Sequence, residues 1–534
     1  MKIGAFWSGH DCSFCVLEDG VPKIHVEYER LLREKEPAGD SVSIYEQHYS
    51  LDDLDYVALC HPISKMQQHP SWLKLQDKFK DKIHVFSHHQ AHAAHGFYTS
   101  PYGDATIITI DGGGIESSTG IETATTVWSG EGNKINRITT VPINQMNIGG
   151  VWTRVTRYVF GLQSGWPRGH QAGTVMAMAA LGNPALYRSD FFTMLTKDVS
   201  LAAMKPHNQP RGANVGTDPK HPHLNKWAEL AQTSEQTKYD IAAGLQAATE
   251  DVFFVFIKDL YDRHPGLSKN VVISGGVALN SVMIGKLSSS DIVNSCYVPP
   301  VPYDGGLVLG AAQLLHHEIL GADRTFEKLS PHLGFEYGTS DIVSVLERTK
   351  NVSVVSCTDD DIINLLNEQN IVAVYGGRSE SGRRALGNRS IFADPRSPTM
   401  KQTVNDKVKH RQWFRPFAPS ILAEHVNEWF ETAPTSLYMT HVAKFRHNKK
   451  ELVPAVVHFD DTGRLQTVDR DVYPWFHNFL TKWYFKTGVP VILNTSFNDS
   501  EPICETPEHA VNCFLKTNID YLYFRDVGLL VSKG

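Results

Sequence analysis

Two neighbouring stretches decide the fold of this chain: SHHQAHAAHGFY at residues 87–98 and DATIITIDGGG at residues 104–114. The first is rich in histidine and alanine and predicts a helix. The second is a short apolar, β-branched run that ends in aspartate and glycines, which predicts a buried strand followed by a tight turn. A helix feeding a buried strand is the repeating unit of an α/β fold.

The histidines of the first stretch have the spacing of metal ligands. His88 and His92 are four residues apart, so on a helix they share one face and both imidazoles can reach one ion. Asp111 ends the following strand, and Asp304 lies in a second glycine-rich turn. Two imidazoles and two carboxylates suit a divalent or trivalent first-row metal. The alternative is a solvated, histidine-rich helix that holds no ion.

Strand and helix signals continue on both sides of these stretches. Residues 2–7, 13–17 and 23–29 predict three successive strands, which is how actin-like and sugar-kinase-like ATPase folds begin. Residues 238–264 carry a helical apolar period, and residues 270–274 predict a short strand. This alternation predicts an α/β architecture.

The chain is too long for a single core, with 534 residues. A boundary is expected near residues 331–340, after which strand and helix patterns start again. We therefore expect two α/β domains, residues 1–338 and a smaller one at 339–534.

Composition excludes several classes of protein. The net charge is −7 and no lysine or arginine run supplies the positive stripe that nucleic-acid binding needs. No stretch approaches the roughly 18 apolar residues that span a bilayer, and the start lacks the pattern of a signal peptide. The seven scattered cysteines, including the Cys12–Cys15 pair, are typical of a reduced, cytoplasmic chain rather than of a metal or redox centre.

Three glycine-rich turns, at residues 111–114, 274–276 and 304–306, each follow a predicted strand. Glycines such as Gly113, Gly275 and Gly276 let backbone N–H groups approach a nucleotide closely. A single turn of this kind is usually a tight connection. Three in one α/β domain favour nucleotide binding.

The C-terminal half contains two basic stretches, GRSESGRRALGNRS at residues 377–390 and KVKHRQWFRPFAP at residues 407–419. Arginine forks match phosphate oxygens bidentately, and lysine adds a point charge. Because these cations alternate with glycine and apolar residues, the pattern indicates an anion pocket near a core rather than a solvated face.

Taken in order, these motifs resemble the O-carbamoyltransferases of antibiotic, toxin and nodulation-factor biosynthesis. The resemblance covers nearly the whole chain. Its motifs are GHD at 9–11 with Ser13, EYER at 27–30 followed by Lys35, HHQAHA at 88–93, SGGVALN at 274–280, RALGNRS at 384–390, RPFAP at 415–419 and NTSFN at 494–498.

The resemblance implies an N-terminal domain of the actin/sugar-kinase (ASKHA) type and a C-terminal domain similar to YrdC-like, adenylate-forming domains. It implies that carbamoyl phosphate and ATP, with magnesium, form carbamoyl adenylate in the C-terminal domain. A hydroxyl of a small natural product would then take the carbamoyl group in the N-terminal domain. No nucleic acid or membrane partner is expected, and a homodimer is compatible with the sequence.

The resemblance also assigns roles to single residues. It implies iron or another divalent metal at His88, His92, Asp111 and Asp304, a general base at His10, and charge stabilisation by Lys35. Carbamoyl phosphate would be bound by Arg384, Lys409 and Arg415. The nucleotide would be bordered by Gly113, Gly275, Gly276, Asn280, Asn388, Asn494 and Ser496.

The chain departs from the family pattern in places and leaves alternatives open. Ser381 and Arg383 stand where the family has an aromatic residue and a proline, and residues 172–174 replace an acidic-Gly-Lys run. Transfer to tRNA or in hydrogenase maturation is the alternative function, and an inactive nucleotide-binding module is a second one. The acceptor is not determined, and a surface loop at residues 205–224 is expected to help line its pocket.

Overall fold

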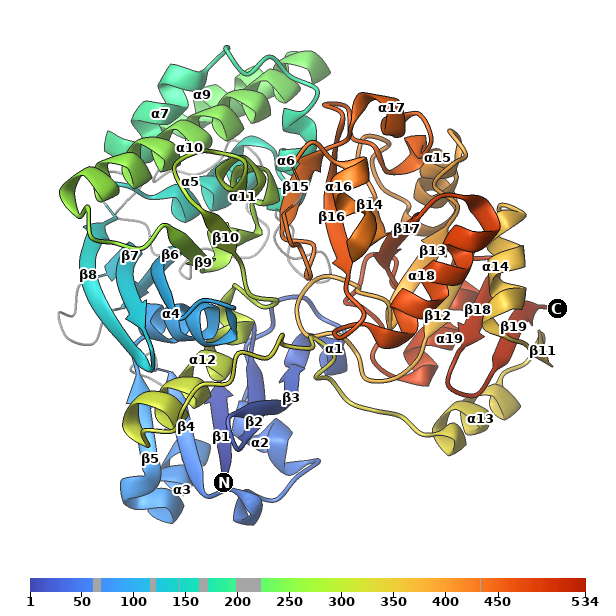
Figure 1. Ribbon diagram of the computed structural model, residues 1–534, viewed down its shortest axis with the longest axis horizontal. Coiled ribbons are helices and arrows are strands. Elements are labelled where there is room, and N and C mark those ends of the chain that lie inside the picture. Colours follow the sequence, from blue (N-terminus) through green and yellow to red (C-terminus); the bar gives the residue numbers. More distant parts are fainter. Residues whose placement is uncertain (61–68, 116–121, 144, 163–170, 198–221, 433) are drawn as a thin grey trace. The chain divides into compact units, whose positions relative to one another are not determined.

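The computed structural model describes residues 1–60, 69–115, 122–143, 145–162, 171–197, 222–432 and 434–534. The chain forms two compact units, Met1–Glu327 and Lys328–Gly534 (Figure 1). Residues 205–221 of the expected acceptor loop lie outside the described residues. Among the helices that are described, none is both long and apolar enough to cross a membrane.

The first unit contains two five-stranded sheets built to one plan. Their strand orders are β3-β2-β1-β4-β5 and β8-β7-β6-β9-β10. In each sheet the first three strands are antiparallel and the last two join in parallel. The strands are β1 (Lys2–Trp7), β2 (Ser13–Glu18), β3 (Val21–Glu27), β4 (Tyr56–Cys60), β5 (Ile83–Phe86), β6 (Asp104–Ile115), β7 (Glu122–Glu131), β8 (Lys134–Pro142), β9 (Asn270–Ser274) and β10 (Ser295–Tyr297).

Two helices lie between these sheets. Helix α4 (His88–Thr99) packs on β6 and β9, and α12 (Leu307–Leu314) packs on β1, β2 and β4, while the two helices pack on each other (Figure 1). Every residue of α4 except Gln90 is buried. The predicted helix is therefore confirmed, and the alternative of a solvated helix is wrong.

The first unit has further α-helices among the described residues. They are α1 (Tyr28–Leu32), α2 (Ser41–Glu46), α3 (Pro70–Phe79), α5 (Ile148–Arg154), α6 (Ala172–Ala179), α7 (Arg188–Lys197), α9 (Pro222–Ala231), α10 (Glu235–Arg263) and α11 (Ser281–Ser288).

Two predicted boundaries in the first unit were wrong. The strand predicted for residues 23–29 ends at Glu27, because α1 begins at Tyr28. The strand that Asp111 was predicted to end continues to residue 115, with an irregularity in its pairing between Ile110 and Gly114. Asp111 therefore lies within an irregular part of the strand rather than at its end.

The second unit is a mixed sheet of nine strands, ordered β11-β19-β18-β12-β13-β17-β14-β16-β15. Its strands are β11 (Val352–Ser356), β12 (Val372–Tyr375), β13 (Arg389–Ala393), β14 (Ala418–Leu422), β15 (His441–Lys444), β16 (Thr462–Val468), β17 (Val491–Ser496), β18 (Tyr521–Phe524) and β19 (Leu529–Lys533). Its helices are α13 (Thr339–Arg348), α14 (Asp359–Asn367), α15 (Met400–Val404), α16 (Val426–Trp429), α17 (His447–Lys450), α18 (Pro474–Thr487) and α19 (Pro507–Lys516).

The segment before α13 belongs to this second unit. Gly334 N–H donates to the Ser379 carbonyl at 3.0 Å, and Phe335 N–H donates to Glu505 at 3.2 Å. These bonds attach residues 328–338 to the nine-stranded sheet, whereas the sequence pattern assigned them to the first domain.

Candidate functional site

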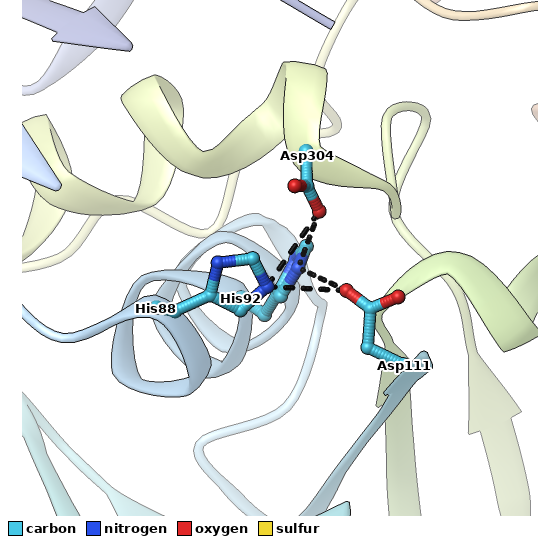
Figure 2. A group of neighbouring side chains, drawn as sticks. All are labelled: His88, His92, Asp111 and Asp304. Carbon is cyan, nitrogen blue, oxygen red and sulfur yellow. Dashed lines mark hydrogen bonds and ion pairs between the residues drawn. The ribbon is translucent and has the colours of Figure 1, made fainter. Parts of the chain in front are cut away.

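Four side chains that are far apart in the sequence converge in the first unit. The Nε2 atoms of His88 and His92 lie 3.1 and 3.2 Å from Asp111 Oδ2, and 3.6 and 3.4 Å from Asp304 Oδ1 (Figure 2). One ligand atom from each residue lies within 4.8 Å of the other three. The structure thus brings together the four residues that the sequence predicted as metal ligands.

Three structural elements position these ligands. Helix α4 presents His88 and His92 on one face, with ring centroids 4.7 Å apart. In the irregular part of β6, the Gly112 N–H donates to Asp111 Oδ1 at 2.7 Å, which leaves Oδ2 directed at the histidines (Figure 2). Asp304 begins the short turn that leads into α12.

The electrostatics of the cluster favour positive charge. Burial lowers the pKa of His92, but hydrogen bonds with Asp111 and Asp304 outweigh it and raise this pKa to about 9. Burial raises the pKa of Asp111, yet the hydrogen bonds from His88 and His92 hold it well below its usual range. Two carboxylates that stabilise positive charge this strongly, beside two imidazole nitrogens, form a donor set that fits a metal cation.

His10 lies at the edge of this cluster. Its Nε2 is 3.2 Å from Asp304 Oδ2, its Nδ1 is 3.0 Å from Asp11, and 45% of its side chain is exposed. Burial lowers the pKa of His10, but the negative charges of Asp304 and Asp11 raise it to about 10. Lys35 lies half-buried in the segment after α1, and its role stays a prediction.

The glycine turns predicted to bind nucleotide lie close to the cluster. Gly275 has a φ of +92°, and a Cβ there would fall 2.2 Å from the Ile110 carbonyl oxygen, so only glycine fits. A Cβ on Gly276 would lie 3.1 Å from Asp111 Oδ1. Gly113 belongs to the irregular part of β6. The turn after β9 therefore lies directly against the irregular part of β6.

Asn280, by contrast, makes hydrogen bonds to other residues of the first unit. Its Oδ1 accepts from the Met283 N–H and so caps α11, while its amide exchanges two hydrogen bonds with Gln246 at 3.0 and 3.2 Å. These bonds occupy the amide that was predicted to border the nucleotide.

The second unit holds a cluster of arginines: Arg384, Arg411, Arg415 and Arg464. Burial lowers the pKa of Arg464 well below its usual range, and the positive charges of Arg384 and Arg415 lower it further. Burial likewise lowers the pKa of Arg411 well below its usual range, and the positive charges of Arg415 and Arg464 lower it further. Buried positive charges that lower one another's pKa destabilise the fold unless an anion compensates them. The cluster therefore fits the predicted anion pocket.

Arg464 was not among the residues predicted from the sequence to bind carbamoyl phosphate. It lies on β16, which pairs with β14, and β14 follows directly after the segment that carries Arg411 and Arg415. Its Nε is buried without a hydrogen-bond partner. A single arginine in an otherwise buried strand was the available signal, but only the strand pairing shows where it lies.

Lys409, predicted to bind carbamoyl phosphate, lies beside Ser496, which was predicted to border the nucleotide. Its ammonium donates to the Ser496 carbonyl at 2.5 Å and to the carbonyl and Oδ1 of Asn498, each at 2.8 Å. An ammonium has three protons to donate. A phosphate oxygen would therefore have to replace one of these acceptors.

The side chains of Asn388 and Asn494 form hydrogen bonds within and to the loop that carries Arg384. The Asn388 amide donates to the Arg378 carbonyl at 2.7 Å, and its backbone N–H donates to Glu380 at the same distance. The Asn494 amide donates to the Ala385 carbonyl at 3.2 Å, and its Oδ1 is buried without a partner. Both side chains support the loop, and Asn494 retains one acceptor for a ligand.

Comparison with known families identifies the class of this chain. The family model of the carbamoyltransferase N-terminus matches residues 67–313, and that of the carbamoyltransferase C-terminus matches residues 363–531. The chain belongs to the carbamoyltransferase family. This membership confirms the predicted resemblance and the predicted class of enzyme, a carbamoyltransferase.

Carbamoyltransferase relatives align over most of the chain. Nodulation protein NolNO from Sinorhizobium fredii is 32% identical over 83% of this chain and 63% of its own length. Nodulation protein NolO from Bradyrhizobium diazoefficiens is 31% identical over 82% of this chain and 77% of its own. An uncharacterized protein from Synechocystis is 30% identical over 98% of this chain and 95% of its own.

Solved structures resemble this carbamoyltransferase only in part. HypF in its phosphate- and nucleotide-bound form gives a TM-score of 0.35 at 15% identity, over 60% of this chain and 56% of that one. A ROK family protein from Streptococcus pneumoniae gives 0.30 at 11% identity, over 60% of this chain and all of that one (100%).

Proposed function

We propose that this carbamoyltransferase uses ATP to move a carbamoyl group from carbamoyl phosphate to a hydroxyl of a small natural product. The observation that carries the proposal is the convergence of His88, His92, Asp111 and Asp304 within the half that matches the carbamoyltransferase N-terminus. The nodulation relatives are consistent with a small-molecule acceptor.

His88, His92, Asp111 and Asp304 would hold a first-row metal, for which we propose iron. A bound cation supplies positive charge that offsets the negative charge of a phosphate-bearing intermediate. It would also neutralise Asp304, which is the main charge that raises the pKa of His10. The pKa of His10 would then be lower, which favours the neutral imidazole that acts as a general base toward the acceptor hydroxyl.

The arginine cluster of the second unit would bind carbamoyl phosphate. Guanidinium forks match phosphate oxygens, and an anion would relieve the mutual repulsion among Arg384, Arg411, Arg415 and Arg464. There, carbamoyl phosphate, ATP and one water would give carbamoyl adenylate, phosphate and pyrophosphate. We propose that the adenylate is made within residues 339–534 and used within residues 1–338.

The sheet order supports one proposal about fold. Both sheets of the first unit follow the same five-strand plan, which is consistent with a duplicated actin/sugar-kinase-like core. For the second unit we retain the YrdC-like, adenylate-forming domain as a proposal.

The experiment incubates the full chain with ATP, carbamoyl phosphate and a panel of alcohols. We expect pyrophosphate release that depends on carbamoyl phosphate, and a product heavier by one carbamoyl unit in mass spectrometry. Transfer to tRNA in a parallel reaction, with none to alcohols, would favour the alternative function. ATP binding without pyrophosphate release would favour an inactive nucleotide-binding module.

A further inference from the structure

We infer that Ser13, His25 and Tyr303 are positioning residues for Asp304, and that they hold the turn carrying this ligand in the one place where it can meet His88 and His92. The inference rests on the proposed metal site and goes beyond it. It concerns residues that do not touch the ion.

The carbonyl of Gly305, the residue after Asp304, is held by two buried side chains. Ser13 Oγ donates to it at 3.0 Å, and His25 Nε2 donates to it at 2.7 Å. The carbonyl can only accept, so the proton of His25 lies on Nε2. Both side chains are 1% exposed, and together they use both lone pairs of the oxygen. The β2–β3 hairpin thus fixes the backbone on one side of the ligand.

The residue before Asp304 is held by the same hairpin. The Tyr303 hydroxyl donates to Glu27 Oε1 at the end of β3. Glu27 is itself buried, and its other oxygen lies 3.9 Å from the Arg30 guanidinium, which balances its charge. Both flanks of Asp304 are therefore anchored to one hairpin that lies nearly 300 positions earlier in the sequence.

The turn has little room to adopt another path. A Cβ on Gly305 would lie 2.9 Å from Glu27 Oε1, and a Cβ on Gly306 would lie 2.0 Å from the Val301 carbonyl oxygen. With the backbone fixed, Asp304 directs Oδ1 toward the two histidines and Oδ2 toward His10. Outer residues that orient a ligand typically change metal affinity by about 10- to 100-fold.

The test measures the affinity of the full chain for Co²⁺ alone, by titration of its visible absorption with a competing chelator. We expect Ser13→Ala and His25→Leu each to weaken Co²⁺ binding by about tenfold or more. His25→Gln retains an N–H donor of similar reach and should bind within about threefold of the wild type. Tyr303→Phe removes one hydroxyl and no carbon, so it tests the second anchor in a variant that keeps its packing.

The matched control is Thr106→Val. Thr106 Oγ1 also donates from a buried position to a carbonyl, that of Ser268, at 2.6 Å, but Thr106 lies near the start of β6 and does not contact the turn that carries Asp304. Thermal melting should fall similarly in Thr106→Val and Ser13→Ala, whereas only the latter should lose Co²⁺ affinity. Equal affinities in Ser13→Ala, His25→Leu and the wild type would overturn the inference.

An error in the proposed metal site would give a different result from an error in the positioning role alone. If the wild type did not bind Co²⁺, or if Asp304→Asn bound it as tightly as the wild type, the ligand assignment itself would be removed and this inference with it. A wild type that binds Co²⁺ through Asp304, with unchanged affinity in the hairpin variants, would overturn the positioning role alone.

Discussion

Gly310 on α12 lies directly against Ala91 on α4, so that a Cβ atom on Gly310 would fall 1.8 Å from the Ala91 carbonyl oxygen. This contact sets the spacing of the two central helices. Ala91 lies next to His92, and Gly310 lies within the helix that begins just after Asp304. The absence of a side chain at Gly310 therefore allows the histidines of α4 to meet the aspartate in the turn before α12.

Replacing Gly310 by alanine should separate α4 from α12. We expect the free energy of unfolding to fall by about 1–3 kcal/mol, since the added methyl group overpacks a closed contact. Co²⁺ binding should weaken as well, because Asp304 moves with α12. Calorimetry and Co²⁺ titration measure the two effects. Gly266→Ala is the control, because a Cβ there meets nothing within 4 Å. Unchanged stability in Gly310→Ala would contradict the tight packing.

Removing one imidazole should empty the metal centre. His88→Ala is expected to reduce bound metal from about one ion per chain to a trace and to abolish carbamoyl transfer, since three ligands remain of a closed set. Metal content is measured by elemental analysis after loading and gel filtration. His48→Ala removes an exposed histidine and should retain the ion. Normal metal content in His88→Ala would count against the ligand assignment.

Removing one arginine of the cluster should weaken carbamoyl phosphate binding and raise the stability of the fold. Arg464→Ala is expected to weaken carbamoyl phosphate binding roughly 10- to 100-fold, the loss typical of a charged hydrogen bond. Its melting temperature should rise, because one of several mutually repelling buried charges is gone. Arg384→Ala should mainly block adenylate formation, measured as pyrophosphate release.

Two further variants complete the test of the arginine cluster. Arg464→Lys keeps the charge but loses the planar fork, so its affinity should be intermediate. Arg470→Ala removes an exposed arginine and should change neither quantity. If Arg464→Ala released pyrophosphate with an unchanged KM for carbamoyl phosphate, Arg464 would not be part of the pocket.

Buried neutral histidines should make the fold sensitive to acid. Burial lowers the pKa of His317 to about 4, and its Nδ1 donates to the Ala322 carbonyl at 2.9 Å. An unfolded histidine titrates with its ordinary pKa of about 6.5. Between about pH 6.5 and pH 4 the unfolded chain therefore binds a proton that the folded one does not, so the unfolding free energy falls as the pH falls.

Denaturant midpoints at about pH 7 and pH 5 measure this dependence. His317→Asn keeps a donor at the same position but cannot be protonated, so its midpoint should drop less on acidification than that of the wild type. His48→Gln, at an exposed position, should drop as much as the wild type. Equal drops in all three proteins would show that His317 does not contribute.

Much of the architecture could be predicted from local pattern. The helix at α4, the strand at β9 and the long helix α10 lie where periodicity and flanking residues indicated. The pairing of His88 with His92 also followed from spacing alone, because a helix places residues four apart on one face. Local patterns predict these helices and strands correctly because the buried side chains recur along the sequence with the period of the backbone.

Other features depend on contacts between distant parts of the chain. Asp111 was expected to end a strand, but it lies in an irregular part of β6, and nothing local marks where a register shifts. Asn280 was predicted to border the nucleotide, and its amide is paired with that of Gln246, 34 positions earlier in the chain. Arg464 joins the arginine cluster only through the pairing of β16 with β14.

The sequence by itself determined which side chains could bind an ion, because helical spacing and ligand chemistry are local properties. Only the tertiary structure decided that Asp304 reaches them, because that depends on the β2–β3 hairpin holding the Gly305 carbonyl and on the close approach of α12 to α4. Such contacts join residues nearly 300 positions apart, and their geometry is set by packing that no short segment encodes.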